Sequence, residues 1–241
     1  MEVLAIIPAR GGSKSIPKKN IIDLCGRPLI SYSIDHALNS RLINRVIVST
    51  DDDEIAEVSL KYGAEVPFKR PSEFAQDLSP DIDVFYHALV WLKENEGYVP
   101  DIVLNHRAIF PIRKVETIDR AIQLFIDTPE AESLRSMVIP RESPFKMWKA
   151  VGDFVEPLII LPGIPQPFNQ PRQVLPTAYW QIGYVDMVRS WVITERHEMS
   201  GKMIALLIEE EWTDIDYLED VVEAERLLKE GAETKERRLS T

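Results

Sequence analysis

Short apolar runs alternate with stretches of helical periodicity through the first half of the chain, and this alternation restricts the fold more than any other feature. The runs that predict buried strands are residues 3–7, 45–49, 65–68 and 101–104. The stretches that predict helices are residues 30–38, 51–62, 82–93 and 118–125. Strands separated by helices form a mostly parallel sheet covered on both faces, so the predicted fold class is α/β. Such sheets bind ligands at the carboxyl ends of their strands.

The loop that follows the first predicted strand concentrates positive charge in an acidic protein. The chain has 28 Lys and Arg residues against 39 Asp and Glu residues, which gives a formal net charge of −11. The loop nevertheless contains the cations Arg10, Lys14, Lys18 and Lys19. Gly11 and Gly12 allow backbone N–H groups to approach an anion, and Ser13 adds a hydroxyl donor. This combination favours a phosphate-binding loop over the alternative, a solvated basic loop.

Composition limits the partners and the compartment. With 241 residues and 45% hydrophobic residues, the chain is long enough for one domain over residues 1–241 with a substantial core. A pI near 5.0 argues against nucleic acid and against an anionic membrane surface as partners. The N-terminus resembles neither a signal peptide nor a membrane span, and the single cysteine, Cys25, cannot form an internal disulfide. We therefore expect a soluble cytoplasmic protein.

The pattern changes between residues 137 and 181, where prolines are frequent and helical periodicity is absent. Aromatic residues such as Phe145, Trp148 and Trp180 make this segment too apolar for a free linker, so it predicts an inserted lobe. After the lobe we expect a helix at 184–192, a strand at 203–208, a last helix near 218–228 and a frayed polar tail at 230–241.

Two aspartates stand between the last predicted strand and the last predicted helix. Residues two apart in an extended segment point the same way, so Asp214 and Asp216 could both face one hard cation. The alternative is that Asp216 caps the helix with Glu219 as its reciprocal partner. A cap does not require Asp214, but spacing alone leaves both interpretations open.

The loop resembles the signature of the acylneuraminate cytidylyltransferases, the CMP-sialic acid synthetase family. That signature reads Ile-Pro-Ala-Arg-Gly-Gly-Ser-Lys-Gly-Ile-Pro-x-Lys-Asn, and residues 7–20 match it except that Ser15 replaces the usual glycine. A second match, over residues 65–80, contains an Arg-Pro followed by an Ala-x-Asp-x-Ser-Pro that resembles the family's Ala-x-Asp-x-Thr-Pro. The resemblance extends from residue 6 to about 224. It implies a Rossmann-like nucleotidyltransferase with a mostly parallel sheet and an inserted dimerisation lobe.

The resemblance also implies a role for each part of the site. The nucleotide-binding residues would be Ala9, Arg10, Gly11, Gly12, Ser13, Lys19, Asn20, Arg70, Ala75 and Asp77. The cofactor would be Mg²⁺, held against the nucleotide phosphates by Asp214 and Asp216. The catalytic residues would be Arg10, Lys19, Asp214 and Asp216. No side chain stands out as the base that deprotonates the sugar hydroxyl, and metal-bound hydroxide and an aspartate are both open.

Substrate binding is implied in the lobe and after the fourth predicted strand. Residues 143–146 and 170–176 resemble the family's Pro-x-Lys and Pro-Arg-Gln-x-Leu-Pro elements. The implied substrate-binding residues are Arg107, Lys146, Arg172 and Gln173, with Lys146 and Arg172 at the sugar carboxylate. In the family the lobe pairs two subunits, so we expect a homodimer in which these cations act at the neighbouring site. The alternative is a polar hinge in a structural hairpin.

Two departures from the family pattern fall beside the site. Where the family has Leu-Leu-Gln-Pro-Thr-Ser-Pro-Leu-Arg, this chain has Arg107 in place of glutamine and Ile109 and Phe110 in place of two hydroxyl residues. A buried aromatic there would fill space where polar groups usually meet the sugar or the nucleotide. Ile182 also stands where an asparagine is usual. Either the acceptor differs or the activity is weakened.

The activity implied is transfer of CMP from CTP to the anomeric hydroxyl of a sialic acid-like 2-keto sugar acid, with release of pyrophosphate. One alternative is a nucleotidyltransferase for another acid, of the octulosonic, legionaminic or amino-sugar type. The other is a family member that binds nucleotide without turnover. No arrangement of the four histidines, the serines or the cysteine supports hydrolase chemistry.

Overall fold

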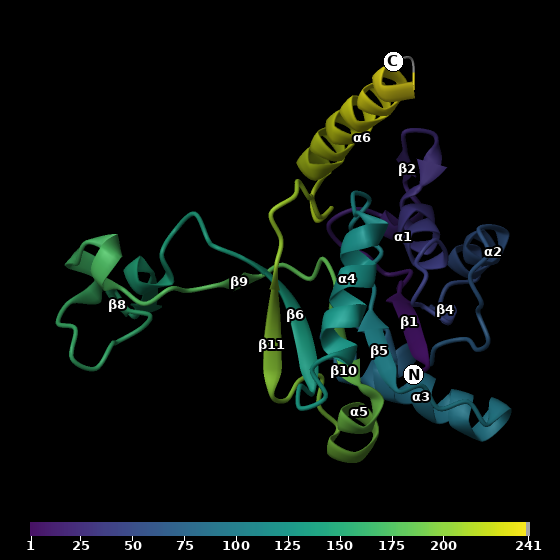
Figure 1. Cartoon of the computed structure of the whole chain (residues 1–241), viewed down its shortest axis with the longest axis horizontal. Coiled ribbons are helices and arrows are strands. Elements are labelled where there is room, and N and C mark those ends of the chain that lie inside the picture. The colour runs from purple at the N-terminus through teal and green to yellow at the C-terminus, as the bar shows by residue number, and fades with distance from the viewer. Residues whose placement is uncertain (240–241) are drawn as a thin grey trace.

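The computed structural model describes the backbone of residues 1–239 and the side chains of residues 1–231. Its centre is a seven-stranded sheet in the order β11-β6-β10-β5-β1-β4, with β9 pairing on β6 (Figure 1). These strands are β1 Val3–Pro8, β4 Arg45–Ser49, β5 Ile102–Asn105, β6 Ser133–Val138, β9 Trp180–Gln181, β10 Asp186–Arg189 and β11 Met203–Leu207. β4, β1 and β5 are parallel, as are β6 and β11, whereas β10 is antiparallel to both of its neighbours. The predicted α/β fold with a mainly parallel sheet is confirmed.

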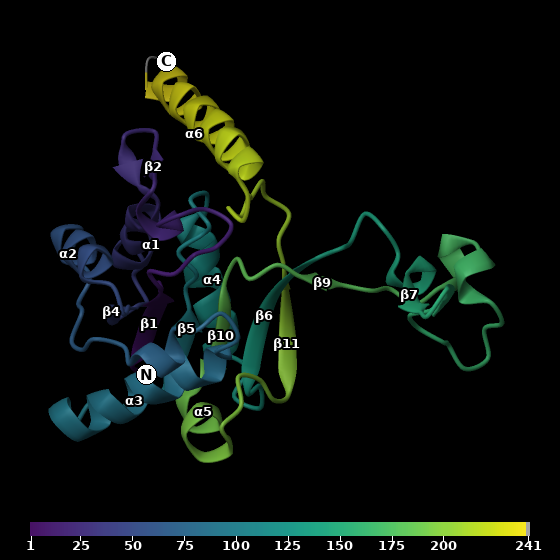
Figure 2. The same cartoon turned by 180° about the vertical axis from the view of Figure 1, so that it is seen from behind.

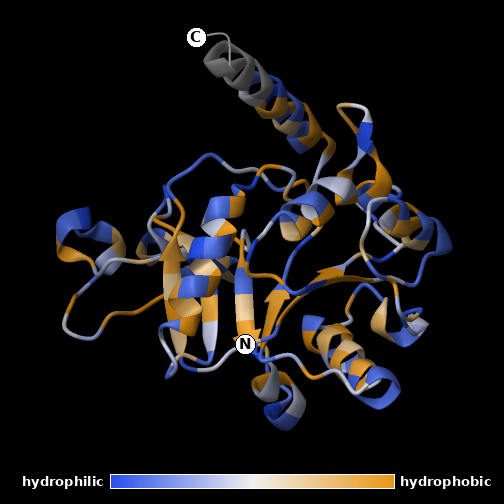
Figure 3. Cartoon of the chain, turned by 45° about the vertical axis from the view of Figure 1, so that its right-hand side comes forward, coloured by the Kyte–Doolittle hydropathy of each residue, from blue (hydrophilic) through white to orange (hydrophobic). Residues whose placement is uncertain are grey.

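Helices cover both faces of the sheet because successive side chains of a strand point to opposite sides. The helices are α1 Leu29–Leu38, α2 Asp53–Lys61, α3 Asp81–Glu96, α4 Val115–Ile126, α5 Ser190–Arg196 and α6 Leu218–Leu239. Val3, Ala5 and Ile7 of β1 share one core with α1, α2 and α4, while Leu4 and Ile6 share the other with α3 and α5. Figures 1 and 2 show these layers from two sides, and Figure 3 shows hydrophobic residues concentrated on the strands.

The prediction of a helix over residues 184–192 is wrong, because this segment forms β10 and the start of α5. β10 is buried between β5 and β6, and two of its residues, Asp186 and Arg189, are charged, so no alternation marks it as a strand. Partners distant in the sequence satisfy these charges. Ser136 donates its N–H and its hydroxyl to Asp186, and Arg189 donates to the Phe125 carbonyl.

Residues 65–68 do not form the predicted strand. Only two isolated bridges form here. Glu65 pairs with Ile47 of β4, and Lys69 pairs with Thr50, the residue that follows β4. Pro67 has no N–H to donate to a ladder, which explains why the pairing is interrupted.

The predicted inserted lobe leaves the sheet at the end of β6 and returns at β9, where Met137 pairs with Gln181. Between them lies a hairpin of β7 Trp148–Val151 and β8 Phe154–Pro157, which projects away from the sheet (Figures 1 and 2). Large apolar side chains of the lobe are exposed, among them Trp148, Phe154, Val155 and Ile160.

A third group of buried residues joins the N-terminal loop to the C-terminal helix. Ile16 of the loop packs with Leu24 of the β2–β3 hairpin (Asp23–Leu24 and Arg27–Pro28), with Ile215 and with Ala224 of α6. This packing places the acidic segment beside the loop.

α6 continues to Leu239 and therefore includes most of the tail predicted to fray from residue 230. Residues 240–241 of that prediction lie outside the described part of the chain. No helix in the described part is long and apolar enough to cross a membrane.

Candidate active site

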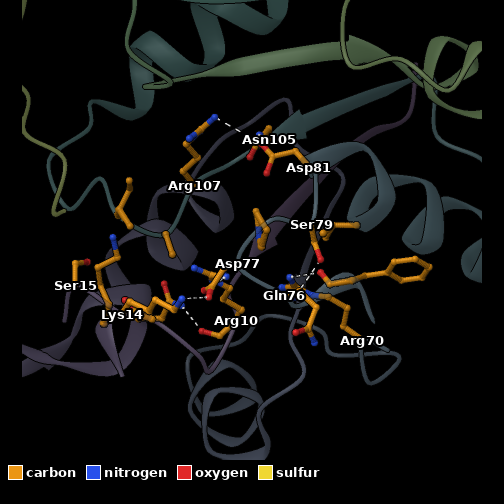
Figure 4. A pocket seen from close by; sticks show the side chains of 18 residues that line it. Arg10, Lys14, Ser15, Arg70, Gln76, Asp77, Ser79, Asp81, Asn105 and Arg107 are labelled. Carbon is orange, nitrogen blue, oxygen red and sulfur yellow. Dashed lines mark hydrogen bonds and ion pairs between the residues drawn. The ribbon is translucent and has the colours of Figure 1, made fainter. Parts of the chain in front are cut away.

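A cavity of about 470 Å³ opens where β1 and β5 end (Figure 4). The residues lining it that were predicted from the sequence are Arg10, Ser13, Lys19, Asn20, Arg70, Asp77 and Arg107. The carboxyl ends of adjacent parallel strands are where α/β sheets bind ligands. The cavity therefore lies where the alternation of strands and helices predicted a site.

The loop after β1 is held by hydrogen bonds to its own backbone and to the start of α2. Gly11 donates its N–H to Asp51 Oδ1 at 3.0 Å, and Asn20 donates its side-chain amide to the Arg10 carbonyl at 3.0 Å. Asp52 caps the N-terminus of α2. The Gly11 N–H therefore donates to an anionic group of the protein itself, the Asp51 carboxylate, and is not free for a phosphate.

The position of Gly11 requires a residue without a side chain. A Cβ at Gly11 would lie 2.6 Å from Asp52 Oδ2, whereas a Cβ at Gly12 would meet nothing within 4 Å. We expect Gly11→Ala to lower the free energy of unfolding by about 1–3 kcal/mol, because the crowded groups must shift. The Tm should fall by several degrees, whereas the matched control Gly12→Ala should change it by about one degree or less. Circular dichroism melts measure both, and equal Tm values would contradict the close approach to Asp52.

All four cations of the loop are paired with acids in this structure. Arg10 Nη1 lies 2.9 Å from Asp77 Oδ1, and Lys14 forms an ion pair with the same carboxylate (Figure 4). Lys14 first, and then Arg10, hold the pKa of Asp77 below its ordinary value. Lys18 pairs instead with Glu54 of α2 and does not line the cavity. Asp77 therefore neutralises two of the cations that a phosphate group would otherwise engage.

Arg70 is a buried cation in the wall of the cavity. Its guanidinium donates to the backbone carbonyls of Ser49 and Phe74, its Nε has no hydrogen-bond partner, and no carboxylate in the described part of the chain forms an ion pair with it. Burial lowers the pKa of Arg70 to about 10. Arg70 is therefore a buried residue and not a surface salt-bridge residue. A buried guanidinium with an unused donor is suited to an anionic or carbonyl-bearing ligand.

The acidic segment before α6 contacts the cationic loop. Lys19 Nζ lies 2.8 Å from Asp216 Oδ1. Ile215 is fully buried between the two aspartates, and its N–H donates to the carbonyl of Ile109, a cavity residue, at 3.0 Å. Asp214 and Asp216 thus flank a residue anchored in the core, next to the loop that is predicted to bind phosphate.

The helix-capping alternative for Asp216 is wrong. Asp220 is the residue that caps the start of α6, because its Oδ2 accepts hydrogen bonds from the N–H groups of Asp216 and Tyr217 at 2.9 and 2.7 Å. The side chain of Asp216 takes no part in this cap and turns to Lys19.

The chemistry of the two aspartates fits a magnesium ion. Burial, and then the negative charge of Asp216, raise the pKa of Asp214, so the carboxylates repel each other where they stand. A divalent cation between them would relieve this repulsion, and Mg²⁺ is commonly bound by one or two carboxylates together with substrate phosphates and water. In the described residues no three His, Cys, Asp or Glu side chains gather around one metal position. The other ligands would therefore come from phosphate and water.

A buried arginine connects the segments beneath the cavity. Arg113 donates to one hydroxyl and three backbone carbonyls at 2.7 to 3.1 Å, those of Ser33, Arg107, Phe110 and Tyr184. Burial lowers the pKa of Arg113 to about 9. These bonds determine the path of the chain from Arg107, which lines the cavity, to Arg113.

His106 is buried beside this network, and we expect it to make the stability of the protein depend on pH. Its Nε2 lies 3.1 Å from the Ser33 carbonyl, and burial, followed by the charge of Arg113, lowers its pKa well below the ordinary value. The unfolded chain then binds a proton that the folded chain does not. The contribution of His106 to the free energy of unfolding should decrease as the pH falls below about 6.5, by about 2 kcal/mol at pH 5. Urea unfolding at pH 7 and pH 5 measures this, and an unchanged difference in His106→Gln would contradict it.

Of the residues that depart from the family pattern, some are buried in the core and others line the cavity. Phe110 is fully buried and packs against Tyr184 and Trp212, with ring centroids 6.2 and 6.1 Å away, so its ring lies in the core and not in the cavity wall. Ile182 is also buried, whereas Ile109 lines the cavity. The expectation that a buried aromatic fills the substrate space is therefore wrong, and Ile109 supplies the apolar surface instead.

The predicted lobe residues Lys146, Arg172 and Gln173 do not line the cavity of their own chain. Arg172 donates to the Arg141 carbonyl at 2.6 Å within the lobe. The lobe projects away from the sheet, so the structure does not bring these residues together with the phosphate loop (Figure 2).

Several cavity residues were missed by sequence reasoning, and several predicted ones lie behind the wall. Among the missed residues are Phe74, Gln76, Ser79, Asp81 and Asn105. A signal existed for Asn105, a polar residue directly after the apolar run 101–104. Ala9, Gly11, Gly12 and Ala75 do not line the cavity. Ala9 is buried and donates its N–H to the Ser49 carbonyl at 3.0 Å, which holds the loop to β4.

A mainly parallel sheet, a cationic glycine loop after its first strand and paired aspartates against that loop together define a nucleotide-binding α/β protein of the nucleotidyltransferase class. Residues 4–149, more than half of the chain, match the family described as cytidylyltransferase, and the chain belongs to this family. This confirms the resemblance seen in the loop signature.

Relatives and a solved structure agree with this membership. The chain is 45% identical over 126 residues to pseudaminic acid cytidylyltransferase of Campylobacter jejuni, an alignment that spans 52% of this chain and about half, 54%, of that relative. It is 32% identical over 231 residues to post-translational flagellin modification protein B of Campylobacter coli, covering 95% of this chain and 96% of that one. The structure of CMP:2-keto-3-deoxy-manno-octonic acid synthetase complexed with CTP superposes with a TM-score of 0.69 at 16% identity, covering 96% of this chain and all of that one. This last similarity shows the fold alone.

Proposed function

We propose that this protein transfers CMP from CTP to the anomeric hydroxyl of a 2-keto sugar acid and releases pyrophosphate. The observation that supports the proposal is the 2.8 Å contact between Lys19 and Asp216, because the cationic loop and the two candidate metal ligands then lie side by side. The relative named pseudaminic acid cytidylyltransferase favours pseudaminic acid or a related sugar acid as the acceptor. We propose the cytoplasm as the compartment, which suits an exposed free thiol at Cys25.

In the proposed reaction the anomeric oxygen attacks the α-phosphorus of CTP, and the bond from this phosphorus to the bridging oxygen breaks. Pyrophosphate leaves with the bridging oxygen, and negative charge grows on the leaving phosphates. Arg10, Lys14 and Lys19 would stabilise this charge once Asp77 releases the first two. Magnesium, when bound by the paired aspartates, would supply further positive charge to the phosphates.

Arg70 would bind the nucleoside side of CTP. Its unused Nε donor lies in a wall that also contains Phe74 and Val84, so a flat base with a carbonyl group finds both a donor and apolar contacts there. The acceptor hydroxyl passes its proton to water as it attacks.

We also propose that two chains pair through the lobe. Trp148 and Phe154 are 47% and 80% exposed on the projecting hairpin, which leaves an apolar surface open to a second copy. Such pairing would allow Lys146 and Arg172 to act at the cavity of the partner. Sedimentation velocity should give about twice the chain mass of 27.6 kDa. Trp148→Asp with Phe154→Asp should reduce the mass to that of one chain, and a single-chain mass for the unmodified protein would refute the dimer.

The test of the proposed function is pyrophosphate release from CTP, UTP, GTP and ATP with a panel of sialic, pseudaminic, legionaminic and octulosonic acids. We expect release with CTP and at least one acid, and about tenfold slower release or none with the other nucleotides. Faster release with UTP or GTP would make the cytidine assignment wrong. No release with any acid, together with CTP binding by calorimetry, would support the rival function, a nucleotide-binding protein without turnover.

A further inference from the structure

The carboxylate of Asp77 lies between two cations of the cavity. Asp77 Oδ1 lies 2.9 Å from Arg10 Nη1, and the other oxygen, Oδ2, forms an ion pair with Lys14 (Figure 4). All three residues line the cavity. Each carboxylate oxygen thus has its own cation, which is the arrangement that two oxygens of a phosphate group would take at the same place.

Asp77 belongs to a short segment, residues 72–79, here called the strap, whose turns are closed by hydrogen bonds of its own. Gln76 donates its side-chain amide to the Ser72 carbonyl at 2.6 Å and its N–H to Ser79 Oγ at 3.0 Å. These bonds do not involve the Asp77 carboxylate. The strap therefore keeps its local shape whether or not Asp77 is paired.

The tip of the strap is not packed into the core. Residues 76–78 are exposed, and Leu78 has 94% of its surface accessible to solvent. The ion pairs of Asp77 with Arg10 and Lys14 join this tip to the loop after β1. A segment with few buried contacts opens locally at a small cost in free energy, so the tip can move away from the cations.

The backbone that carries Arg10, in contrast, is held in place. Asn20 donates to the Arg10 carbonyl at 3.0 Å, and the preceding residue, Ala9, donates its N–H to the last residue of β4 at 3.0 Å. In the part of the chain that the structure describes, no acid other than Asp77 pairs with Arg10 or Lys14. These two cations are therefore either neutralised by Asp77 or free for a ligand.

An internal anion on the cations lowers their affinity for an external anion. When a site is open to its ligand for only a fraction of the time, the apparent Kd rises in inverse proportion to that fraction. A terminal phosphate group carries more negative charge than a carboxylate, so a triphosphate or a pyrophosphate is able to displace Asp77. When the phosphates leave, the same carboxylate is close enough to pair with the cations again.

We propose that Asp77 is an internal competitor of the phosphates, which occupies Arg10 and Lys14 in the free protein, leaves them when CTP binds and returns as pyrophosphate departs. This inference rests on the proposed function and gives Asp77 a role in product release. Removal of the carboxylate should tighten the binding of phosphates. The effect has the opposite sign to that of a residue that binds the nucleotide directly, which is the role that the family resemblance implies for Asp77.

Calorimetric titration of CTP, and separately of inorganic pyrophosphate, tests this role. Both ligands are titrated with Mg²⁺ at about 0.15 M salt, where charges more than about 8 Å apart are largely screened. Pyrophosphate has neither a base nor a ribose, so its binding reports the loop cations alone. Asp77→Asn keeps the size of the side chain and removes its charge. It should lower the Kd for both ligands by about threefold to tenfold, which is the effect of losing two partly exposed ion pairs.

A second variant and a control complete the design. Asp77→Ala also removes the oxygen that an asparagine still offers to Arg10, so it should lower the Kd at least as much. Glu54→Gln removes the same charge from the acid that pairs with Lys18, a loop cation that does not line the cavity, and should change both Kd values by about twofold or less. In the transfer assay, the concentration of pyrophosphate that halves the rate should fall in Asp77→Asn by the same factor as the Kd for pyrophosphate.

An unchanged or higher Kd for CTP and pyrophosphate in both Asp77 variants would overturn the competition and leave CMP transfer intact. An equal decrease in Glu54→Gln would also overturn it, because the change in net charge would then explain the effect. Absence of pyrophosphate release with every acceptor, together with tighter binding in the Asp77 variants, would refute CMP transfer and leave the competition standing. Absence of binding of both ligands to every variant would refute both proposals. The two failures are therefore distinguishable.

Discussion

Asp216→Asn and Asp214→Asn should each slow pyrophosphate release by about a hundredfold to a thousandfold. The amide removes the negative charge that a cation between the loop and α6 needs, while its size stays the same. The folded protein should not lose stability in Asp214→Asn. Burial and Asp216 raise the pKa of Asp214, which means that its carboxylate costs stability at every pH above its folded-state pKa. Loss of turnover with an unchanged or higher Tm is therefore the expected result.

The measurement is coupled pyrophosphate release at saturating CTP and magnesium, beside a thermal melt of each variant. Glu219→Gln is the matched control, because Glu219 is exposed in the same segment and should change the rate by about twofold or less. A rate within about tenfold of the unmodified protein in either aspartate variant would show that the pair does not hold the catalytic cation.

Arg113→Met should lower the free energy of unfolding by about 4 kcal/mol or more. Methionine replaces much of the side-chain volume but leaves the Ser33 hydroxyl and three buried carbonyls without their donor. We expect partial unfolding at 37 °C, and loss of activity as a consequence, since Arg107 and Ile109 lie on the segment that Arg113 holds.

Urea denaturation followed by circular dichroism measures this loss. Arg120→Met is the matched control, and its exposed position on α4 predicts a change within about 0.5 kcal/mol. A loss below about 1 kcal/mol in Arg113→Met would show that these four hydrogen bonds do not hold the floor of the cavity.

The parts of the fold that the sequence predicted are those whose signal is local. The run 3–7 is apolar throughout because β1 is buried on both faces, and 45–49 coincides with β4 for the same reason. The helices α1, α2, α3 and α4 were predicted because their apolar residues recur at helical spacing, and in α2 the acids Asp53 and Glu54 also lie in the first turn. Each of these signals lies within one element.

β10 and β6 were not predicted because their buried polar residues hide the pattern. Asp186 and Arg189 stand in β10, and Ser133, Arg135 and Ser136 stand in β6. Their hydrogen-bond partners come from other strands and from loops far along the chain. These polar side chains can therefore be buried without losing their hydrogen bonds only when the whole sheet has formed. The substrate roles of the lobe residues stay predictions, because the lobe leaves them far from their own cavity.

The sequence by itself determined the family of this protein, the phosphate-binding character of residues 7–20 and the two aspartates at 214 and 216, because these are short patterns of charge, glycine and spacing. Only the tertiary structure decided that Lys19 forms an ion pair with Asp216 and that Asp77 neutralises Arg10 and Lys14. It also decided that Asn105 Oδ1 and Arg107 Nε are buried without a hydrogen-bond partner. These relations depend on the order of strands in the sheet and on how residues far apart in the chain pack together. No local pattern encodes either of them.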